Sequence, residues 1–163
     1  MAIRGAPLAD STLKARKLGS NKRVLCASPD YIDRRGAPSC PSDLVNHDCI
    51  GISSMPVWYF NGPDGEITHQ VAAFITGDTS DFSYDAAMCG LGVSLKSIAH
   101  VWEDLRDGRL VEVMQDYPVV REGAIWAVYP PGKFTPPKVT VFVDFLLSKY
   151  GRPPYWETDY RTA

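Results

Sequence analysis

The residue types that could do chemistry gather in residues 75–82, where a predicted strand runs into a predicted helix. The strand ends at Gly77, and the hydroxyl residues Thr79 and Ser80 stand at the helix start. Free N–H groups and the positive end of the helix dipole favour a carboxylate or another anion there. Because glycine lets the backbone approach a ligand and ligands of open α/β sheets lie beyond the carboxyl ends of strands, the segment predicts a binding site. Simple capping of the helix by Thr79 and Ser80 is the alternative interpretation.

Lys96 is a second candidate for the same crevice. It directly follows the short predicted strand 93–95, so its side chain could reach the helix start. A surface position is the other interpretation of a single lysine, and the sequence leaves both open.

Catalytic and metal-binding patterns are missing from the sequence. His47, His69 and His100 are scattered, without a His-x-x-x-His pair or a Cys/His cluster, so we expect no metal site. There is no G-x-S-x-G elbow and no Walker loop, and residues 90–92 lack the third glycine and the acidic residue of a dinucleotide site. Nothing places the Cys26 thiol beside His47 as a nucleophile and base. We therefore expect neither an enzyme nor a bound cofactor.

The composition is that of an ordinary globular domain. The 163 residues are 45% hydrophobic and 22% charged, which excludes a disordered chain. No apolar run approaches the roughly 20 residues of a membrane-spanning helix, and the first seven residues hold no apolar signal core. The four cysteines lack C-x-x-C spacing and stand in apolar contexts, so we expect buried, reduced thiols. These features predict one cytoplasmic domain without membrane contact.

The charges are unevenly distributed although the net charge is only −2. Residues 14–23 hold five Lys/Arg without interleaved aromatic residues, which favours the solvated edge of a strand over a nucleic-acid surface. Glu103, Asp104 and Asp107 lie on one predicted helix, where we expect a solvated acidic face.

Short strands and helices alternate along the first part of the chain. Ser28 before Pro29 is typical of a helix start, since serine caps and proline fits the first helical position. Gly36 ends that helix, and a similar start follows at Pro41. The turn residues 61–65 separate strands expected at 58–60 and 67–75, which predicts a β-hairpin. Other strands are expected at residues 11–18, 23–27, 49–53, 93–95, 110–114 and 123–129.

Three helices are expected in the second part. The first begins at Thr79 or Ser80 and runs to about Cys89, and the second runs from about Ser97 to Arg106. The third opens at Pro136 and Pro137, and residues at three- and four-residue intervals give it one apolar face: Val139, Phe142, Phe145, Leu146 and Lys149. Residues 151–163 form a tail from which Tyr155 and Trp156 could dock. Strands alternating with helices predict an α/β architecture.

Several short stretches form an ordered set over residues 2–156. RVLCASPDYI at residues 23–32 is the most specific, and the others are AIRGAPLADS (2–11), PSDLVNHDCI (41–50), GLGVSLKS (90–97), DLRDGRLV (104–111), AIWAVYP (124–130) and PPYW (153–156). In this order they resemble the C-terminal effector-binding domain, also called the LysR substrate-binding domain, of LysR-type transcriptional regulators. The resemblance implies an α/β, periplasmic-binding-protein-like effector domain with two subdomains, two crossing strands and the ligand in the cleft between the subdomains.

The resemblance also implies a division of the chain, with the second subdomain complete and the first subdomain partial. Residues 1–18 would be a remnant of subdomain I and the first crossing strand, and residues 19–121 the effector-binding subdomain II. Residues 122–163 would be the return crossing strand, the C-terminal helix of subdomain I and the tail. A winged helix-turn-helix and most of subdomain I would precede the chain in the longer regulator.

The function implied is that of a cytoplasmic sensor, a homo-oligomer that binds a small-molecule effector such as an organic acid and reaches DNA only through the winged helix-turn-helix. The family usually carries Ser-Asn-Asp before the central helix, whereas this chain has Gly77-Asp78-Thr79. The carboxylate of Asp78 could disfavour an anionic effector or favour one with an amine or hydroxyl group. An oligomerisation module without a ligand and a solute-binding protein stay open as alternatives. The effector-binding residues that we expect are Arg4, Gly5, Ser53, Gly77, Asp78, Thr79, Ser80, Phe82 and Lys96.

Overall fold

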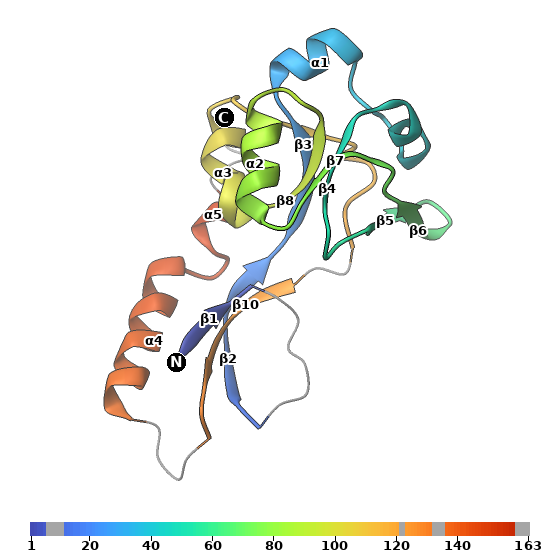
Figure 1. Cartoon of the computed structure of the whole chain (residues 1–163). Helices are drawn as coiled ribbons and strands as arrows, with labels where there is room; N and C mark the ends of the chain where they lie inside the picture. Colours follow the sequence, from blue (N-terminus) through green and yellow to red (C-terminus); the bar gives the residue numbers. More distant parts are fainter. Residues whose placement is uncertain (6–11, 121–122, 132–135, 159–163) are drawn as a thin grey trace.

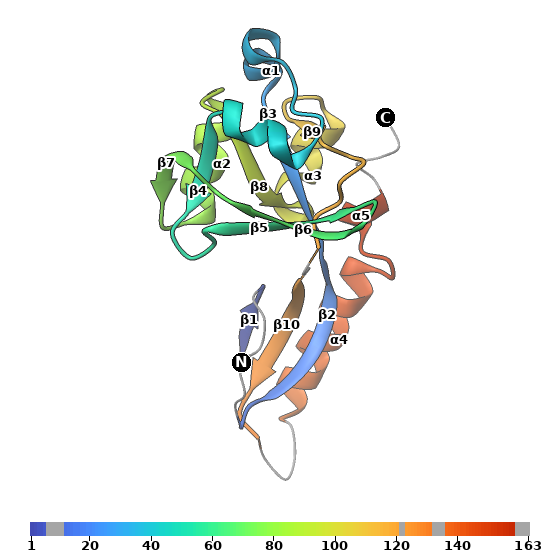
Figure 2. The same ribbon diagram turned by 90° about the vertical axis from the view of Figure 1, so that its right-hand side faces the viewer.

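Two lobes of unequal size, joined by long strands, make up the protein (Figure 1). The computed structural model describes residues 1–5, 12–120, 123–131 and 136–158. The smaller lobe is a three-stranded antiparallel sheet with the order β1-β10-β2. Its strands are β1 (Ala2–Arg4), β2 (Lys14–Asn21) and β10 (Gly123–Tyr129). Figure 2 shows helix α4 (Pro137–Tyr150) lying along this sheet.

The larger lobe is built on a five-stranded sheet with the order β7-β4-β8-β3-β9. Strands β4, β7 and β8 are mutually parallel, whereas β3 is antiparallel to both of its neighbours. The strands are β3 (Arg23–Ala27), β4 (Cys49–Ile52), β7 (Ala73–Gly77), β8 (Val93–Ser97) and β9 (Val111–Val113). The mixed α/β fold confirms the predicted fold class.

Both faces of this sheet are covered, and side chains alternate between them as the period of a strand requires. On one face, Val24, Cys26 and Ile50 pack with α2 (Ser80–Met88) and α3 (Ile98–Arg106). On the other face, Leu25, Val93 and Leu95 pack with Trp58 and Phe60. Trp58 and Phe60 belong to a hairpin of β5 (Val57–Gly62) and β6 (Gly65–Gln70). The remaining elements of this lobe are α1 (Pro29–Arg35) and the 3₁₀ helix η1 (Pro41–Asn46).

The prediction of a single strand over residues 67–75 is wrong. The segment is divided into β6, which pairs with β5, and β7, which pairs in parallel with β4. The division falls at Val71, whose N–H donates to the carbonyl of Pro56 at 3.0 Å instead of continuing either ladder. Consequently the chain leaves the hairpin and returns to the main sheet within a few residues.

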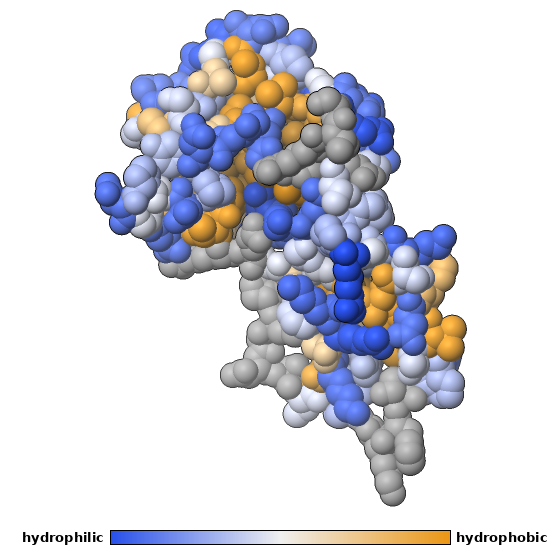
Figure 3. All heavy atoms as spheres, turned by 180° about the vertical axis from the view of Figure 1, so that it is seen from behind, coloured by the Kyte–Doolittle hydropathy of each residue, from blue (hydrophilic) through white to orange (hydrophobic). Residues whose placement is uncertain are grey.

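Three expectations about burial are also corrected. Asp104 is buried, not solvated, because it accepts hydrogen bonds from the hydroxyl of Tyr84 at 3.1 Å and from Nε of Arg109 at 2.7 Å. Of the four free cysteines, Cys89 is exposed and Cys40 is half-buried. In α4, Val143 is the buried residue, while Phe142 and Phe145 are exposed. Figure 3 shows hydrophobic residues on the surface of the smaller lobe.

The end of the described chain docks onto the larger lobe as α5 (Tyr155–Thr158). Trp156 is buried in the cluster that holds Val24 and Ile98. Its ring also packs edge-on against the ring of Tyr150 of α4, with 4.9 Å between the ring centroids. Glu157 forms a 2.9 Å ion pair with Lys22 and accepts a hydrogen bond from Ser20. The C-terminal segment therefore contacts both lobes next to the strands that join them.

Candidate functional site

The parallel strands of the larger lobe end at the edge of the sheet that faces the smaller lobe (Figure 1). Ile52 of β4 pairs with Gly77 of β7, so the residues after both strands lie side by side. The N–H of Ser53 donates to the carbonyl of Gly77 at 2.9 Å, and its hydroxyl donates to Oδ1 of Asp78 at 2.7 Å. The sequence therefore brings two of its expected site residues, Ser53 and Asp78, into direct contact across two strands.

Thr79 is the N-cap of α2. Its backbone is extended, and its hydroxyl accepts from the N–H of Phe82 at 3.2 Å. This contact satisfies one of the N–H groups that have no partner inside the first turn of a helix. The capping interpretation is thus correct for Thr79, and Ser80 is the first residue of the helix itself.

Gly77 is required by the close approach of Phe82. A Cβ atom at position 77 would overlap the aromatic ring of Phe82. The glycine thus lets the first turn of α2 fold back against the end of β7 and fixes the direction in which the helix starts.

Lys96 is buried under the same turn, so the surface interpretation of this residue is wrong. Its side chain is 1% exposed, and Nζ lies 2.9 Å from Oγ of Ser80 and 2.8 Å from Oγ of Ser83. Nζ also donates to the backbone carbonyl of Ser80. Burial lowers the pKa of Lys96 to about 8. When protonated, this lysine adds a positive charge to the positive end of the helix dipole.

An imidazole lies next to Ser80 on the outer side of the helix. His100 of α3 stacks on Tyr84 with 4.9 Å between ring centroids, and its Nδ1 is 3.5 Å from Oγ of Ser80. Desolvation lowers the pKa of His100. Ser80 therefore has two nitrogen-bearing neighbours, the buried Lys96 and the more exposed His100.

The last two expected site residues, Arg4 and Gly5, lie in the smaller lobe and are exposed. No described contact joins them directly to Ser53 or to the first turn of α2. The carbonyl of Gly5 accepts from Nδ2 of Asn21 at 2.9 Å, and Oδ1 of Asn21 accepts from the hydroxyl of Ser97. Asn21 thereby connects the end of β1 to the residue that follows Lys96.

Two residues that the sequence did not indicate as site residues, Arg23 and Ser54, line a cavity of about 250 Å³ next to Ser53. Met55 and Trp58 form part of its apolar wall, and Nη1 of Arg23 lies 2.9 Å from Sδ of Met55. Burial lowers the pKa of Arg23. Lys14, Arg16 and Lys17 are exposed as expected, but Arg23 departs from that solvated cluster because it starts a strand of the larger lobe.

The arrangement provides hydroxyl groups, N–H groups of a helix start and buried positive charge, which are groups that bind and orient a small polar molecule. Among the described residues, no group of three His, Cys, Asp or Glu side chains is placed to hold a metal ion. Across the described ranges, every helix is too short or too polar to cross a membrane. Fold and site together define a ligand-binding domain of the periplasmic-binding-protein-like kind.

Comparison with known proteins identifies the family. The model of the LysR substrate binding domain matches residues 1–151, and the chain belongs to this family. The chain is 33% identical over 138 residues to the HTH-type transcriptional regulator DmlR of Escherichia coli. The matched region covers 82% of this chain and 44% of DmlR. The chain thus spans about half the length of the curated relatives it matches.

Solved structures agree with this assignment. The regulatory domain of CrgA, a LysR-type transcriptional regulator from Neisseria meningitidis, superimposes with a TM-score of 0.82 at 26% identity, over 91% of this chain and 74% of that one. The full-length Vibrio cholerae virulence activator AphB gives a TM-score of 0.77 at 27% identity, over 90% of this chain and 50% of AphB. The expected role as an effector-binding regulatory domain is therefore confirmed and favoured over the alternatives.

Proposed function

We propose that the chain senses a small hydroxy acid where Ser53, Asp78 and Thr79 meet at the start of α2. The hydrogen bond from Ser53 to Asp78 carries this proposal, because it brings the ends of two parallel strands together beside a helix N-terminus. An effector carboxylate would lie against the N–H groups of the first turn, near the buried charge of Lys96. An effector hydroxyl would donate to the carboxylate of Asp78.

The other candidate residues would support this site in different ways. Gly77 and Phe82 would set the direction of the first turn through their close contact. Ser80 would orient Lys96. Arg4 and Gly5 would approach the effector from the smaller lobe, if the cleft closes between the proposed subdomains, residues 1–18 with 122–163 and residues 19–121.

We further propose that this domain binds without catalysing a reaction and acts in the cytoplasm as part of a homo-oligomer. The regulators that it resembles support this role. In the longer protein the bound effector would change the relative pose of the two lobes, and only a helix-turn-helix domain would contact DNA.

Calorimetric titration with a panel of small hydroxy acids and their deoxy analogues tests the proposal. We expect saturable binding of at least one hydroxy acid and weaker binding of its deoxy analogue. Ser53→Ala should weaken the binding about tenfold, since it removes a hydrogen bond to the charged Asp78. Ser148→Ala is the matched control, because Ser148 is exposed on α4 in the other lobe. Equal binding by the two serine variants would contradict the proposed site.

Self-association is a second candidate function, favoured by the exposed side chains of Val141, Phe142 and Phe145 on α4. An exposed apolar face of this kind promotes contact with another protein surface. Light scattering should show an oligomer that Phe142→Ser with Phe145→Ser converts to a smaller species. A monomer at high concentration would exclude this function.

A further inference from the structure

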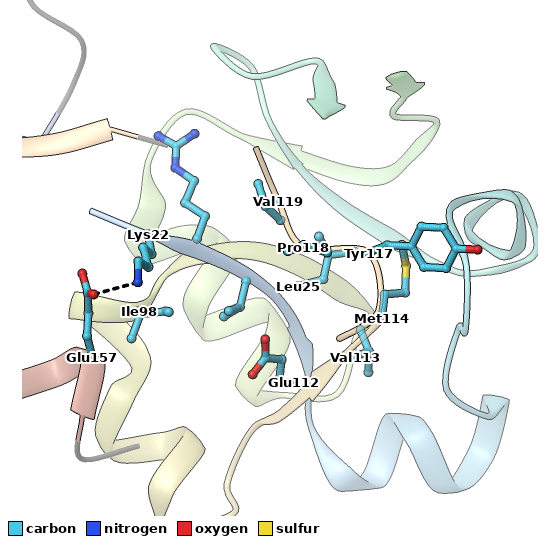
Figure 4. Close-up of a pocket in the computed structure, with 12 residues that line it drawn as sticks. Lys22, Leu25, Ile98, Glu112, Val113, Met114, Tyr117, Pro118, Val119 and Glu157 are labelled. Atoms are coloured by element: carbon cyan, nitrogen blue, oxygen red, sulfur yellow. Dashed lines mark ion pairs between the residues drawn. The ribbon is translucent and has the colours of Figure 1, made fainter. Parts of the chain in front are cut away.

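A second cavity lies along β3, on the side toward β9, and is separate from the start of α2. Strand β9 ends at Val113, and the next residue, Met114, has φ = 56°, a left-handed conformation that is uncommon outside glycine. After Met114 the chain leaves the edge of β3 and reaches β5, where the N–H of Asn61 donates to the carbonyl of Pro118 at 2.9 Å. A fork opens between β3 and residues 117–119, and a cavity of about 250 Å³ occupies it (Figure 4). We refer to it as the β3 cavity.

The backbone of β3 forms one wall of the β3 cavity. Strand β8 pairs with residues 23–26 of β3, whereas β9 pairs only with residues 25–27. Among the described residues, no strand pairs with Arg23 and Val24 on the β9 side. An unpaired edge of this kind accepts the backbone of an extended peptide. Backbone groups of a strand alternate between its two sides, and those of Val24 pair with Lys96 of β8, so Arg23 is the residue whose N–H and C=O face this edge. A peptide of two residues would span the positions opposite Val24 and Arg23.

The side chains around the β3 cavity combine an apolar lining with charges of both signs. The apolar residues include Leu25, Ile98, Val113 and Met114. At the Lys22 end, Figure 4 shows the ion pair between Lys22 and Glu157, with 2.9 Å between Nζ and Oε2. The lining also includes Arg23 and Glu112, so it offers apolar contacts together with charged side chains of both signs.

The charges are ordered along β3. Where β3 begins, Lys22 is paired with Glu157 and Arg23 is the next cation, whereas Glu112 is opposite Cys26, three residues beyond Arg23 along the strand. This separation is about 10 Å at the rise of an extended strand. A peptide that continued the line of β9 would run antiparallel to β3, with its N-terminus toward Glu112 and its C-terminus toward Arg23. In that direction both terminal charges meet side chains of opposite sign.

We propose that the β3 cavity is a second ligand site and binds a dipeptide with apolar side chains and free termini. Its volume lies just below the range of about 300–1,000 Å³ that is typical of sites for drug-sized ligands. The dipeptide takes the place that β9 would occupy if it continued past Val113. This site goes beyond the proposed effector site, and neither depends on the other. The β3 cavity also lies next to Lys22 and Glu157, where the C-terminal segment meets the strands that join the lobes.

The probe for this site is L-leucyl-L-leucine, added to the full chain labelled with ¹³C in the methionine methyl groups. Met114 lines the β3 cavity, whereas Met88 lies on α2 and serves as an internal control. Met114→Leu assigns the Met114 signal. We expect a saturable shift of the Met114 signal and an unmoved Met88 signal.

Chemical variants of the probe and of the protein separate the proposal from nonspecific binding. N-acetyl-leucyl-leucine amide lacks both terminal charges and should bind at least tenfold more weakly. Glu112→Gln should also weaken binding of the free dipeptide about tenfold, through loss of a charge-assisted contact. Glu103→Gln, an exposed position on α3, is the matched control and should bind as the unchanged chain does.

Three results would overturn the proposal. The first is a Met114 signal that does not move at millimolar dipeptide. The second is equal affinity for the free and the blocked dipeptide, which would show that the charged ends are not recognised. The third is unchanged affinity of the Glu112→Gln variant for the dipeptide, which would show that the dipeptide does not bind beside Glu112 in the β3 cavity.

Discussion

Nζ of Lys96 lies 2.9 Å from the hydroxyl oxygen of Ser80, so the first turn of α2 rests on a buried amine. The partners of this amine are neutral oxygens of Ser80 and Ser83. Hydrogen bonds therefore hold the charge in place, but they do not neutralise it.

The free energy of unfolding should rise as the pH increases from about 8 toward 10.5. Burial lowers the pKa of Lys96 in the folded chain to about 8, from 10.5 for an unperturbed lysine. Between these values the unfolded chain binds more protons than the folded chain, which makes stability increase with pH. Urea unfolding at several pH values measures this slope. In Lys96→Met the contribution should disappear, and an identical slope in the variant would contradict the prediction.

Thr79→Ala should destabilise the protein by about 1 kcal/mol, the usual effect of losing a helix N-cap. The variant leaves the N–H of Phe82 without its acceptor. Thr79→Ser keeps the hydroxyl and should retain most of the stability. Chemical denaturation of the three proteins measures the difference, and the free energy of unfolding should fall with denaturant concentration at the same slope in all three. Equal losses in both variants would assign the effect to packing of the threonine methyl group.

Gly77→Ala should destabilise the chain by about 1–3 kcal/mol, because the added methyl group overlaps the ring of Phe82. The double variant Gly77→Ala with Phe82→Ala removes this overlap. It should therefore be more stable than the sum of the two single changes predicts. Additive effects in thermal unfolding would show that the ring is not what requires glycine at position 77.

Asp104→Ala should destabilise the chain by about 2 kcal/mol, since it removes the acceptor of two hydrogen bonds at a buried position. The exposed neighbour Glu103 provides the control, and Glu103→Ala should change stability by less than about 0.5 kcal/mol. Denaturant midpoints of both variants measure the difference. Similar values for the two positions would contradict the structural role of Asp104.

Elements with local signals were predictable from the sequence. Helix α1 begins after Ser28 and ends before Gly36 as expected, because the cap, the proline and the glycine all act within one turn. Strand β10 has the predicted bounds, Gly123–Tyr129, since a continuous apolar run defines it. The break between β6 and β7 was not predictable, because it depends on the pairing of β7 with the distant strand β4.

The candidate site was predictable in outline only. The strand–glycine–hydroxyl pattern located the start of α2, including the N-cap Thr79. Burial of Lys96 depends on Ser80 and Ser83, which are 16 and 13 residues away, and burial of Asp104 depends on Tyr84, 20 residues away. Such partners are set by the packing of α2 and α3 on one face of the sheet, and a pattern of neighbouring residues does not reveal them.

Trp156 adds a further connection between the two lobes, beside the strands that join them. Two strands crossing between two bodies still allow the bodies to turn about the line that the strands define. The docked indole, together with Tyr150 and Glu157, attaches the lobes at another place beside that line. In the reorientation of the lobes proposed above, Trp156 would either leave its buried position or stay in place while the C-terminal segment moves with α3.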